Sequence, residues 1–449
     1  MSVIAAIIFF TCSNFRHTAF QSTAMDLGFF DQAVYLMSRG ELPIVSFWGY
    51  HVLGGHADYN LYLIAELYKL YPDARWLLAI QAVSLALGGI FVWLLARQRN
   101  IGEYSSITLA IAYWLYPLVF NVNLFDFHPE VMAVPGLLAA VWLALKKSWL
   151  GGFVFCVVFV LGCKAVISLT VAAMGIWLWI FKRRCKYGFA ALVLGLVWFV
   201  LATKVVIPAF RPDGVEAVFR YAYLGNSVGE IFLNFLLKPH LILGRLLSWE
   251  SLKYLAILAF PVIWGLSPRH LAPLLGAFPV LGINLLSEHP LQRTLEHQYS
   301  LPILPFLFIA IIEAVATGWK IPSRKVVIAW CVVALLFLGN PKKFFNGFRV
   351  LDTWEATRES IELIPSDATV LTDNWLAPHL THRKNLLLVG HPSPLSIDLE
   401  TPEYILLNAR HPWEPNAEVV RNLVTHFLNR PNFNLIYSQD DVFLFAKID

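Results

Sequence analysis

The chain has 449 residues, of which 58% are hydrophobic and only 14% charged, and its formal net charge is +4. Soluble domains usually carry about 25% charged residues, so this composition excludes an ordinary soluble protein. The small net charge, without a basic stripe and interleaved aromatics, also argues against a nucleic-acid-binding protein. Long apolar runs fill residues 74–345 and predict an integral membrane protein, with membrane lipid as a partner and no nucleic acid.

The apolar runs predict eleven membrane spans. A spanning helix needs about 20 apolar residues. The first run, Val3–Cys12, is short, so we expect a truncated first span or one that extends through Phe20. A signal peptide is the alternative, but no Lys or Arg precedes the run. The other ten spans are expected near 76–95, 105–121, 131–145, 149–163, 165–181, 187–207, 253–266, 271–286, 301–317 and 326–339.

The basic residues of the short loops predict the orientation of these spans. With eleven spans and the N-terminus inside, all five loops that carry Lys or Arg fall on the inner side. Residues 149–181 form one apolar run broken by Lys164, and we expect a hairpin of two spans with Lys164 near its outer turn. The outer segments are then 14–75, 122–130, 208–252, 287–300 and 340–449.

The pattern changes to short alternating segments from Asp352 onward. We expect helices over Thr353–Ile364 and Asn416–Leu428 and short strands between and after them. The predicted fold class is therefore mainly α, a polytopic transmembrane helical bundle with a small C-terminal α/β domain. The expected domains are 1–345, with its long first outer loop 14–75, and an extracytoplasmic α/β domain over 346–449. We find no Gly-rich phosphate loop or nucleophile elbow in the second.

Polar residues gather in the outer segments and at the outer turn. Ionisable groups at membrane depth are costly, so they tend to face a cavity and to be functional. A carboxylate beside a bound hydroxyl could act as a general base. Histidines, Lys164 or Arg293 could hold a phosphate leaving group, where charge develops. The candidate residues are Asp26, Asp31, Gln32, His56, His128, Glu130, Lys164, His297 and Tyr299.

These residues also have structural interpretations. Asp26 and Asp31 could cap the following helix, and Glu130 after Pro129 is typical of a helix start. Lys164 could extend to the membrane surface. His56 could be an ordinary loop residue, and His297 and Tyr299 could be interfacial anchors. The His, Asp and Glu spacing matches no zinc signature, so we assign no metal ligand, and a divalent metal ion stays open as a cofactor.

Several motifs together resemble a family of bacterial polytopic membrane proteins catalogued as a domain of unknown function. They are D-L-G-F-F-D-Q (Asp26–Gln32), G-G-H (Gly54–His56), F-H-P-E (Phe127–Glu130), the stretch from Arg220-Tyr221 to Gly225, H-Q-Y-S-L-P-I-L-P-F (His297–Phe306) and the segment Asp373–Leu380. Members often read K-E-D-like where this chain has Lys164-Ala165-Val166, so two carboxylates are missing. The N-terminus is also shorter than the family pattern.

That family is similar to the GT-C superfamily of membrane glycosyltransferases, whose long first outer loop carries an acidic residue just after the first span. The resemblance implies an inverting transferase with Asp26 as the catalytic acid that takes the acceptor proton or orients the acceptor. It also implies a polyprenyl-phosphate-linked sugar as donor, with the other candidate residues binding substrate. A lipid or glycan transporter or flippase is the first alternative and requires ionisable residues deep inside spans. A non-catalytic scaffold is the second, favoured by the carboxylates missing after Lys164.

Overall fold

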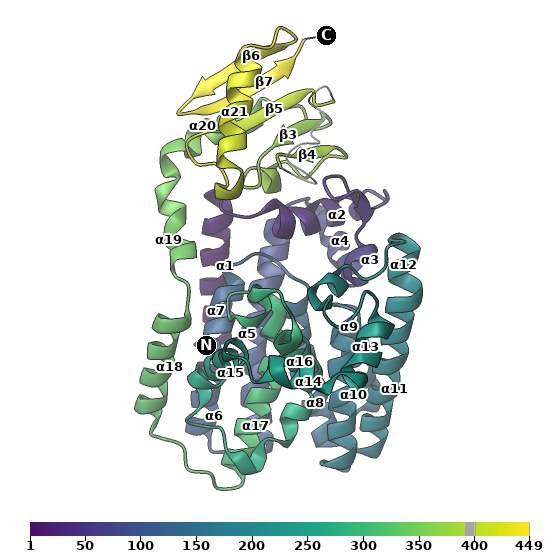
Figure 1. Cartoon of the computed structure of the whole chain (residues 1–449). Helices are drawn as coiled ribbons and strands as arrows, with labels where there is room; N and C mark the ends of the chain where they lie inside the picture. Colours follow the sequence, from purple (N-terminus) through teal and green to yellow (C-terminus); the bar gives the residue numbers. More distant parts are fainter. Residues whose placement is uncertain (391–398, 400, 449) are drawn as a thin grey trace.

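The helices form a long bundle with a small sheet at one end, as the computed structural model of residues 1–390, 399 and 401–448 shows (Figure 1). In the first half of the chain the bundle contains α1 (Ser2–Thr18), α5 (Arg75–Gln98), α6 (Glu103–Trp114), α7 (Pro117–Asn123), α8 (Glu130–Lys146), α9 (Leu150–Leu161), α10 (Ile167–Ile180), α11 (Cys185–Leu201) and α12 (Ile207–Phe210). In the second half it contains α13 (Val228–Leu237), α14 (Pro239–Leu246), α15 (Trp249–Ala259), α16 (Phe278–Leu286), α17 (Leu304–Ala316) and α18 (Arg324–Leu338).

Among the described residues, three helical stretches are long and apolar enough to cross a membrane: Arg75–Gln98, Cys185–Phe210 and Gln298–Ala316. Two bent pairs raise this number to five if each is one span. They are Glu103–Trp114 with Pro117–Asn123, bent by 45°, and Arg324–Leu338 with Lys342–Glu362, bent by 53°. Pro117 begins the second helix of the first pair, and Pro341 directly precedes the second helix of the other pair. Proline disfavours continuation of a helix, which explains both bends. Helix length and composition therefore do not confirm eleven spans.

The largest departure from the predicted spans lies at 253–266 and 271–286. Instead of two continuous helices, α15 ends at Ala259 and short 3-10 turns follow before α16 begins at Phe278. Pro261, Pro268 and Pro273 each open one of these turns. A proline has no backbone N–H to donate and clashes with the preceding turn, which explains the breaks. At the other end, α1 continues to Thr18, the longer of the two expected extents.

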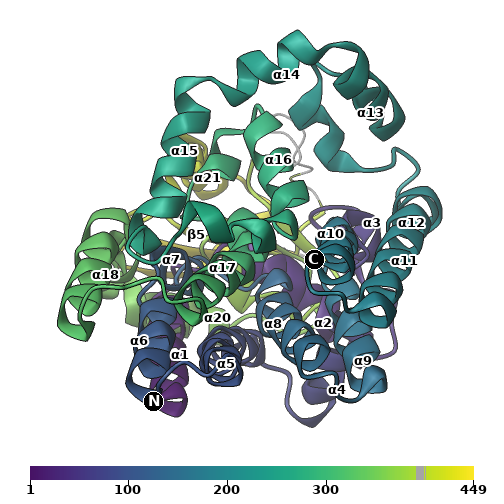
Figure 2. The ribbon, with the colours of Figure 1, turned by 90° about the horizontal axis from the view of Figure 1, so that it is seen from below.

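Glycines bring α10 and α11 into close contact, and the two helices lie side by side in both views (Figures 1 and 2). A Cβ at Gly175 would lie 2.6 Å from the Gly188 carbonyl oxygen, and one at Gly188 would lie 2.7 Å from that of Gly175. A Cβ at Gly195 would lie 2.6 Å from the Ser168 carbonyl oxygen. Small residues that let backbones approach are typical of helix pairs within membranes.

The C-terminal region holds a five-stranded sheet in the order β4-β3-β5-β7-β6. Strand β3 (Val370–Thr372) pairs in parallel with β4 (Leu386–Leu388) and β5 (Tyr404–Asn408), and β7 (Val442–Lys447) pairs antiparallel with β5 and β6 (Phe433–Gln439). Helix α21 (Ala417–Leu428) packs on it through a buried cluster that includes Leu371, Ile405 and Phe427. Helices α19 (Lys342–Arg349) and α20 (Trp354–Glu362) connect the bundle to this sheet.

The segment between α1 and α5 lies directly under the sheet. It contains α2 (Phe29–Ser38), α3 (Leu53–His56), α4 (Leu61–Leu70), β1 (Ile44–Val45) and β2 (Tyr50–His51). The backbone N–H of Ala24 donates to the Asn374 carbonyl oxygen over 2.9 Å. The Gln32 amide donates to the Arg383 carbonyl oxygen, also over 2.9 Å. The two segments, far apart in sequence, therefore hold each other in place at the end of the bundle.

Candidate functional site

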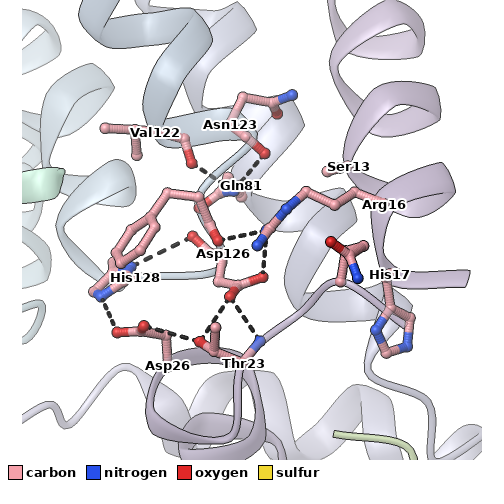
Figure 3. Close-up of polar contacts among 12 residues, drawn as sticks. Ser13, Arg16, His17, Thr23, Asp26, Gln81, Val122, Asn123, Asp126 and His128 are labelled. Atoms are coloured by element: carbon pink, nitrogen blue, oxygen red, sulfur yellow. Dashed lines mark hydrogen bonds and ion pairs between the residues drawn. The ribbon is translucent and has the colours of Figure 1, made fainter. Parts of the chain in front are cut away.

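Asp26 lies on a π-helical turn, Ala24–Gly28, that follows α1. Its side chain is 24% exposed, so one face remains accessible. Oδ1 lies 3.1 Å from Nε2 of His128, and Oδ2 accepts a hydrogen bond of 2.9 Å from the Thr23 hydroxyl (Figure 3). Burial acts to raise the pKa of Asp26, but the interactions with His128 and Thr23 outweigh it and lower the pKa. Asp26 is therefore an ionised, oriented carboxylate.

A second carboxylate, Asp126, lies behind Asp26 and is fully buried. Its Oδ1 forms an ion pair of 2.9 Å with Arg16 Nη1, and its Oδ2 accepts from the backbone N–H and the hydroxyl of Thr23 (Figure 3). The Thr23 hydroxyl is 2.9 Å from Oδ2 of both acids. A hydroxyl has one proton to donate, so it serves one carboxylate at a time and couples the two groups. Burial raises the pKa of Asp126.

Two histidines lie on either side of Phe125. The His128 ring stacks on Phe125 with centroids 5.2 Å apart, and the His297 ring meets its edge at 4.5 Å. Burial would lower the pKa of His128, but Asp26 raises it above its ordinary value. Burial and Lys343 lower the pKa of His297 to about 4, so His297 is neutral near pH 7.

Lys343 is a member of this cluster that the sequence analysis missed. Its Nζ lies 4.6 Å from the Phe125 ring centroid and 4.0 Å from Glu296 Oε2. The ammonium is buried and has no hydrogen-bond partner within the part of the chain that the structure describes. A buried ammonium without a hydrogen bond is costly. Its position just after the last predicted span was the available signal, but its contact with Phe125 depends on folding.

Glu130 and Lys164 form a buried ion pair next to His128. Lys164 Nζ donates to Glu130 Oε1 over 2.5 Å, and the side chains are 10% and 5% exposed for Lys164 and Glu130. Glu130 begins α8, and Lys164 lies between α9 and α10. Lys164 therefore points into the protein and does not extend to the surface. Asp58, another residue missed in the sequence, is buried beside this pair, and burial raises its pKa well above the ordinary value.

His56 and Tyr299 complete this side of the cluster. The His56 carbonyl oxygen accepts from the Ala165 N–H over 2.9 Å, and burial, aided by Lys164, lowers the pKa of His56 well below its ordinary value. The Arg220 guanidinium lies over the Tyr299 ring at 5.3 Å. Ala165, where the family pattern often has a carboxylate, belongs to a buried apolar cluster.

Asp31 and Gln32, which were expected to bind substrate, instead make contacts with the C-terminal region. Asp31 is 1% exposed; it accepts 2.6 Å from the Tyr68 hydroxyl, accepts from Thr381 and pairs with His382 at 3.1 Å. The Gln32 side-chain amide N–H groups donate to the Ser46 hydroxyl and to the Arg383 carbonyl oxygen. Both residues join the first loop to the C-terminal region. Neither Asp26 nor Asp31 makes a helix-capping hydrogen bond.

The described residues contain no group of three or more His, Cys, Asp or Glu side chains arranged to hold a metal ion. Asp26 and Glu130 are instead engaged with His128 and Lys164. The cluster that forms is thus organised by ion pairs and hydrogen bonds. We call it the Asp26 cluster: Asp26, His56, His128, Glu130, Lys164, His297, Tyr299 and the added Lys343.

The fold is similar to that of ArnT from Cupriavidus metallidurans, a GT-C glycosyltransferase. The structure of ArnT bound to undecaprenyl phosphate gives a TM-score of 0.54 at 12% sequence identity, covering 99% of this chain and 96% of that one. The apo state gives 0.53 at 11% identity with the same coverage. No curated protein matches the sequence. At this identity the likeness establishes an ArnT-like fold.

The sequence itself identifies the family. Residues 16–444 match the family described as predicted membrane protein (DUF2079). This match includes the whole Asp26 cluster and nearly all of the C-terminal sheet. It confirms the expected family of polytopic membrane proteins and an integral membrane location. The chain therefore belongs to the DUF2079 family of predicted membrane proteins and has an ArnT-like fold.

Proposed function

We propose that this protein is an inverting glycosyltransferase that takes a sugar from a polyprenyl-phosphate donor at the outer membrane face. The observation that carries the proposal is the pairing of an accessible, ionised Asp26 with His128 beside the Lys343 ammonium, which makes no hydrogen bond to the described residues. One solved structure with this fold, ArnT, was bound to undecaprenyl phosphate. That lipid supports a polyprenyl phosphate as the leaving group here.

The Asp26 cluster supplies groups for each change in the reaction. Asp26 accepts the proton of the acceptor hydroxyl while the acceptor oxygen bonds to the anomeric carbon of the sugar. The bond from that carbon to the phosphate oxygen breaks, and the electron pair leaves with the polyprenyl phosphate. Lys343 pairs with the phosphate of the bound donor and stabilises the further charge that develops there as the bond breaks. His128 holds the Asp26 carboxylate in position throughout.

The remaining residues of the Asp26 cluster shape the sugar-binding region in this proposal. The ion pair of Glu130 with Lys164 keeps two charged groups at a fixed separation from His128. Neutral His56 and His297 each offer one donor and one acceptor to sugar hydroxyls. Tyr299 presents an aromatic ring braced by Arg220.

The proposed topology has eleven spans, with the N-terminus inside, residues 1–345 as the membrane domain and 346–449 as the outer domain. In this topology, bent helix pairs and short helices together cross the membrane where no single helix is long enough to do so. Labelling of single cysteines in intact cells with an impermeant thiol reagent tests this orientation. A cysteine at Asn429 should react, whereas one at Arg183 should react only after permeabilisation.

A transporter or flippase remains the second candidate because broken helices are typical of transport proteins. The breaks near Pro117 and Pro341 are the observation in its favour. A transporter, however, requires ionisable residues deep inside its spans, whereas the Asp26 cluster lies at helix ends. A non-catalytic scaffold would not need the hydrogen bond between Asp26 and His128. Release of a labelled polyprenyl-phosphate sugar to the outer leaflet without transfer would favour the transporter.

The donor role is tested with purified protein and a panel of undecaprenyl-phosphate sugars. Lys343→Met should raise the KM for the donor about tenfold, since a hydrogen bond to a charged group contributes about 1.5–3 kcal/mol. Lys342→Met is the matched control because Lys342 is exposed and adjacent. Equal KM values in the two variants would remove Lys343 from the proposed phosphate site.

A further inference from the structure

A separate cavity of about 340 Å³ lies between the membrane bundle and the C-terminal region. The end of α1 contributes His17 and Thr18, and the segment before α5 contributes Asp73 with Arg75 at the helix start. Trp354 of α20 closes another side. The volume lies at the lower end of the range for small-molecule sites, about 300–1,000 Å³. Asp26, His128 and Lys343 do not line this cavity.

The charged groups in the cavity wall are already paired. Asp73 accepts from Arg75 through both carboxylate oxygens, at 2.6 to 2.9 Å. Asp31 pairs with His382 at 3.1 Å. A further wall residue, Arg358, lies 3.5 Å from Glu362. An anion would have to compete with these carboxylates, so the wall favours an uncharged polar ligand.

Two stacked imidazoles, His17 and His379, form a polar part of the cavity wall. The rings of His17 and His379 are 4.2 Å apart and nearly parallel, and His379 Nε2 donates to the His17 carbonyl oxygen over 3.0 Å. Burial lowers the pKa of His379 to about 4, so that ring is neutral. Nδ1 of His17 is buried and has no partner among the described residues, on a side chain only 7% exposed. Because its one N–H already donates to His17, the neutral His379 ring keeps one acceptor nitrogen, Nδ1.

Aromatic surfaces complete the wall. The Phe20 ring lies 4.4 Å from the His379 ring, and the Trp354 indole N–H donates to the Thr18 carbonyl oxygen over 2.9 Å. Paired polar groups beside aromatic surfaces suit a sugar ring, which has hydroxyls at its edge and C–H groups on its faces.

We propose that this cavity binds a neutral saccharide and that this saccharide belongs to the acceptor. The second part rests on the glycosyltransferase function proposed above. Asp26 and Asp31 lie on consecutive elements, the π-helical turn and α2, so one short segment joins the Asp26 cluster to the cavity wall. An acceptor held in the cavity by its inner sugars would extend its terminal hydroxyl along this segment toward Asp26.

The test is saturation-transfer NMR on the full-length protein in detergent, with maltose, lactose, cellobiose and N,N′-diacetylchitobiose as probes. Thr18→Trp fills the cavity from an exposed position and should weaken binding of the positive probe about tenfold or more. Thr11→Trp, at an exposed position of the same helix, is the matched control and should bind as the wild type does. A thermal unfolding midpoint close to that of the control verifies folding of the Thr18 variant.

The outcomes separate the two proposals. Binding of no probe at millimolar concentration, or binding that Thr18→Trp leaves unchanged, would overturn the cavity assignment. Binding of inorganic phosphate in place of the saccharides would make the cavity an anion site and overturn it too. Asp26→Asn should lower transfer about 10²–10⁴-fold while leaving saccharide binding intact. Saccharide binding by a wild-type protein that transfers no sugar would support the cavity and contradict the transferase function.

Discussion

Replacing Lys164 with methionine should cost the protein much of its stability. Lys164 Nζ is 2.5 Å from Glu130 Oε1, and both side chains are at least nine-tenths buried, so solvent screens the pair little. Removing the ammonium leaves the Glu130 carboxylate buried and uncompensated next to Asp58. Breaking a buried pair in this way costs about 3–5 kcal/mol. The direct measurement is the free energy of unfolding in mixed micelles by denaturant titration.

The structure offers an internal control for this experiment. Lys69 pairs with Glu66 at 2.6 Å, but these side chains are 50% and 64% exposed. Lys69→Met should therefore change the unfolding free energy by less than about 1 kcal/mol. The double variant Lys164→Met/Glu130→Gln should recover part of the loss, because the unpaired charge is gone. Similar small losses for Lys164→Met and Lys69→Met would refute the buried pair.

Two further predictions concern helix packing and pH. Gly188→Ala should destabilise the α10–α11 pair by about 1–3 kcal/mol, because the added Cβ would lie 2.7 Å from the Gly175 carbonyl oxygen. Gly282→Ala is the control, since open space surrounds Gly282 and the added methyl group should not destabilise the protein. Thermal unfolding of the two variants measures the difference. Asp31 raises the pKa of His382, and that pair lowers the pKa of Asp31. The pair's stabilisation is full below the ordinary His pKa of about 6.5 and is lost as pH rises through the raised value. It is lost again as pH falls through the lowered pKa of Asp31. The unfolding midpoints of the wild type and of His382→Ala, measured over a series of pH values, should differ between these two pKa values and become similar above and below them.

Local patterns in the sequence predict much of the fold but not where the helices break. The apolar runs predict the helices because burial in lipid requires long apolar segments. The alternating pattern after Asp352 likewise predicts the strands of the C-terminal sheet. Pro261 and Pro273 break the two spans expected at 253–266 and 271–286, because each lacks a backbone donor. Whether a proline breaks a helix depends on whether neighbouring helices can donate hydrogen bonds to the carbonyl groups that it leaves free. The local sequence does not contain that information.

The candidate site divides in the same way. Asp26 and His128 were identifiable because polar residues at span ends are costly and therefore conspicuous. Asp31 is equally conspicuous, but its partners Thr381 and His382 lie some 350 positions away in the chain. Nothing near Asp31 indicates that pairing. Lys343 was missed for the converse reason, since only folding brings it onto Phe125.

The central claim is that Asp26 takes the acceptor proton in a glycosyl transfer. The most direct test is turnover by Asp26→Asn, with an undecaprenyl-phosphate sugar that the wild type uses and with donor binding measured in parallel. General base catalysis contributes about 10²–10⁴-fold, so transfer should fall by that factor while donor binding changes little. Asp213→Asn, in an exposed loop, should retain full activity. Unchanged transfer by Asp26→Asn would contradict the assigned role and the mechanism built on it.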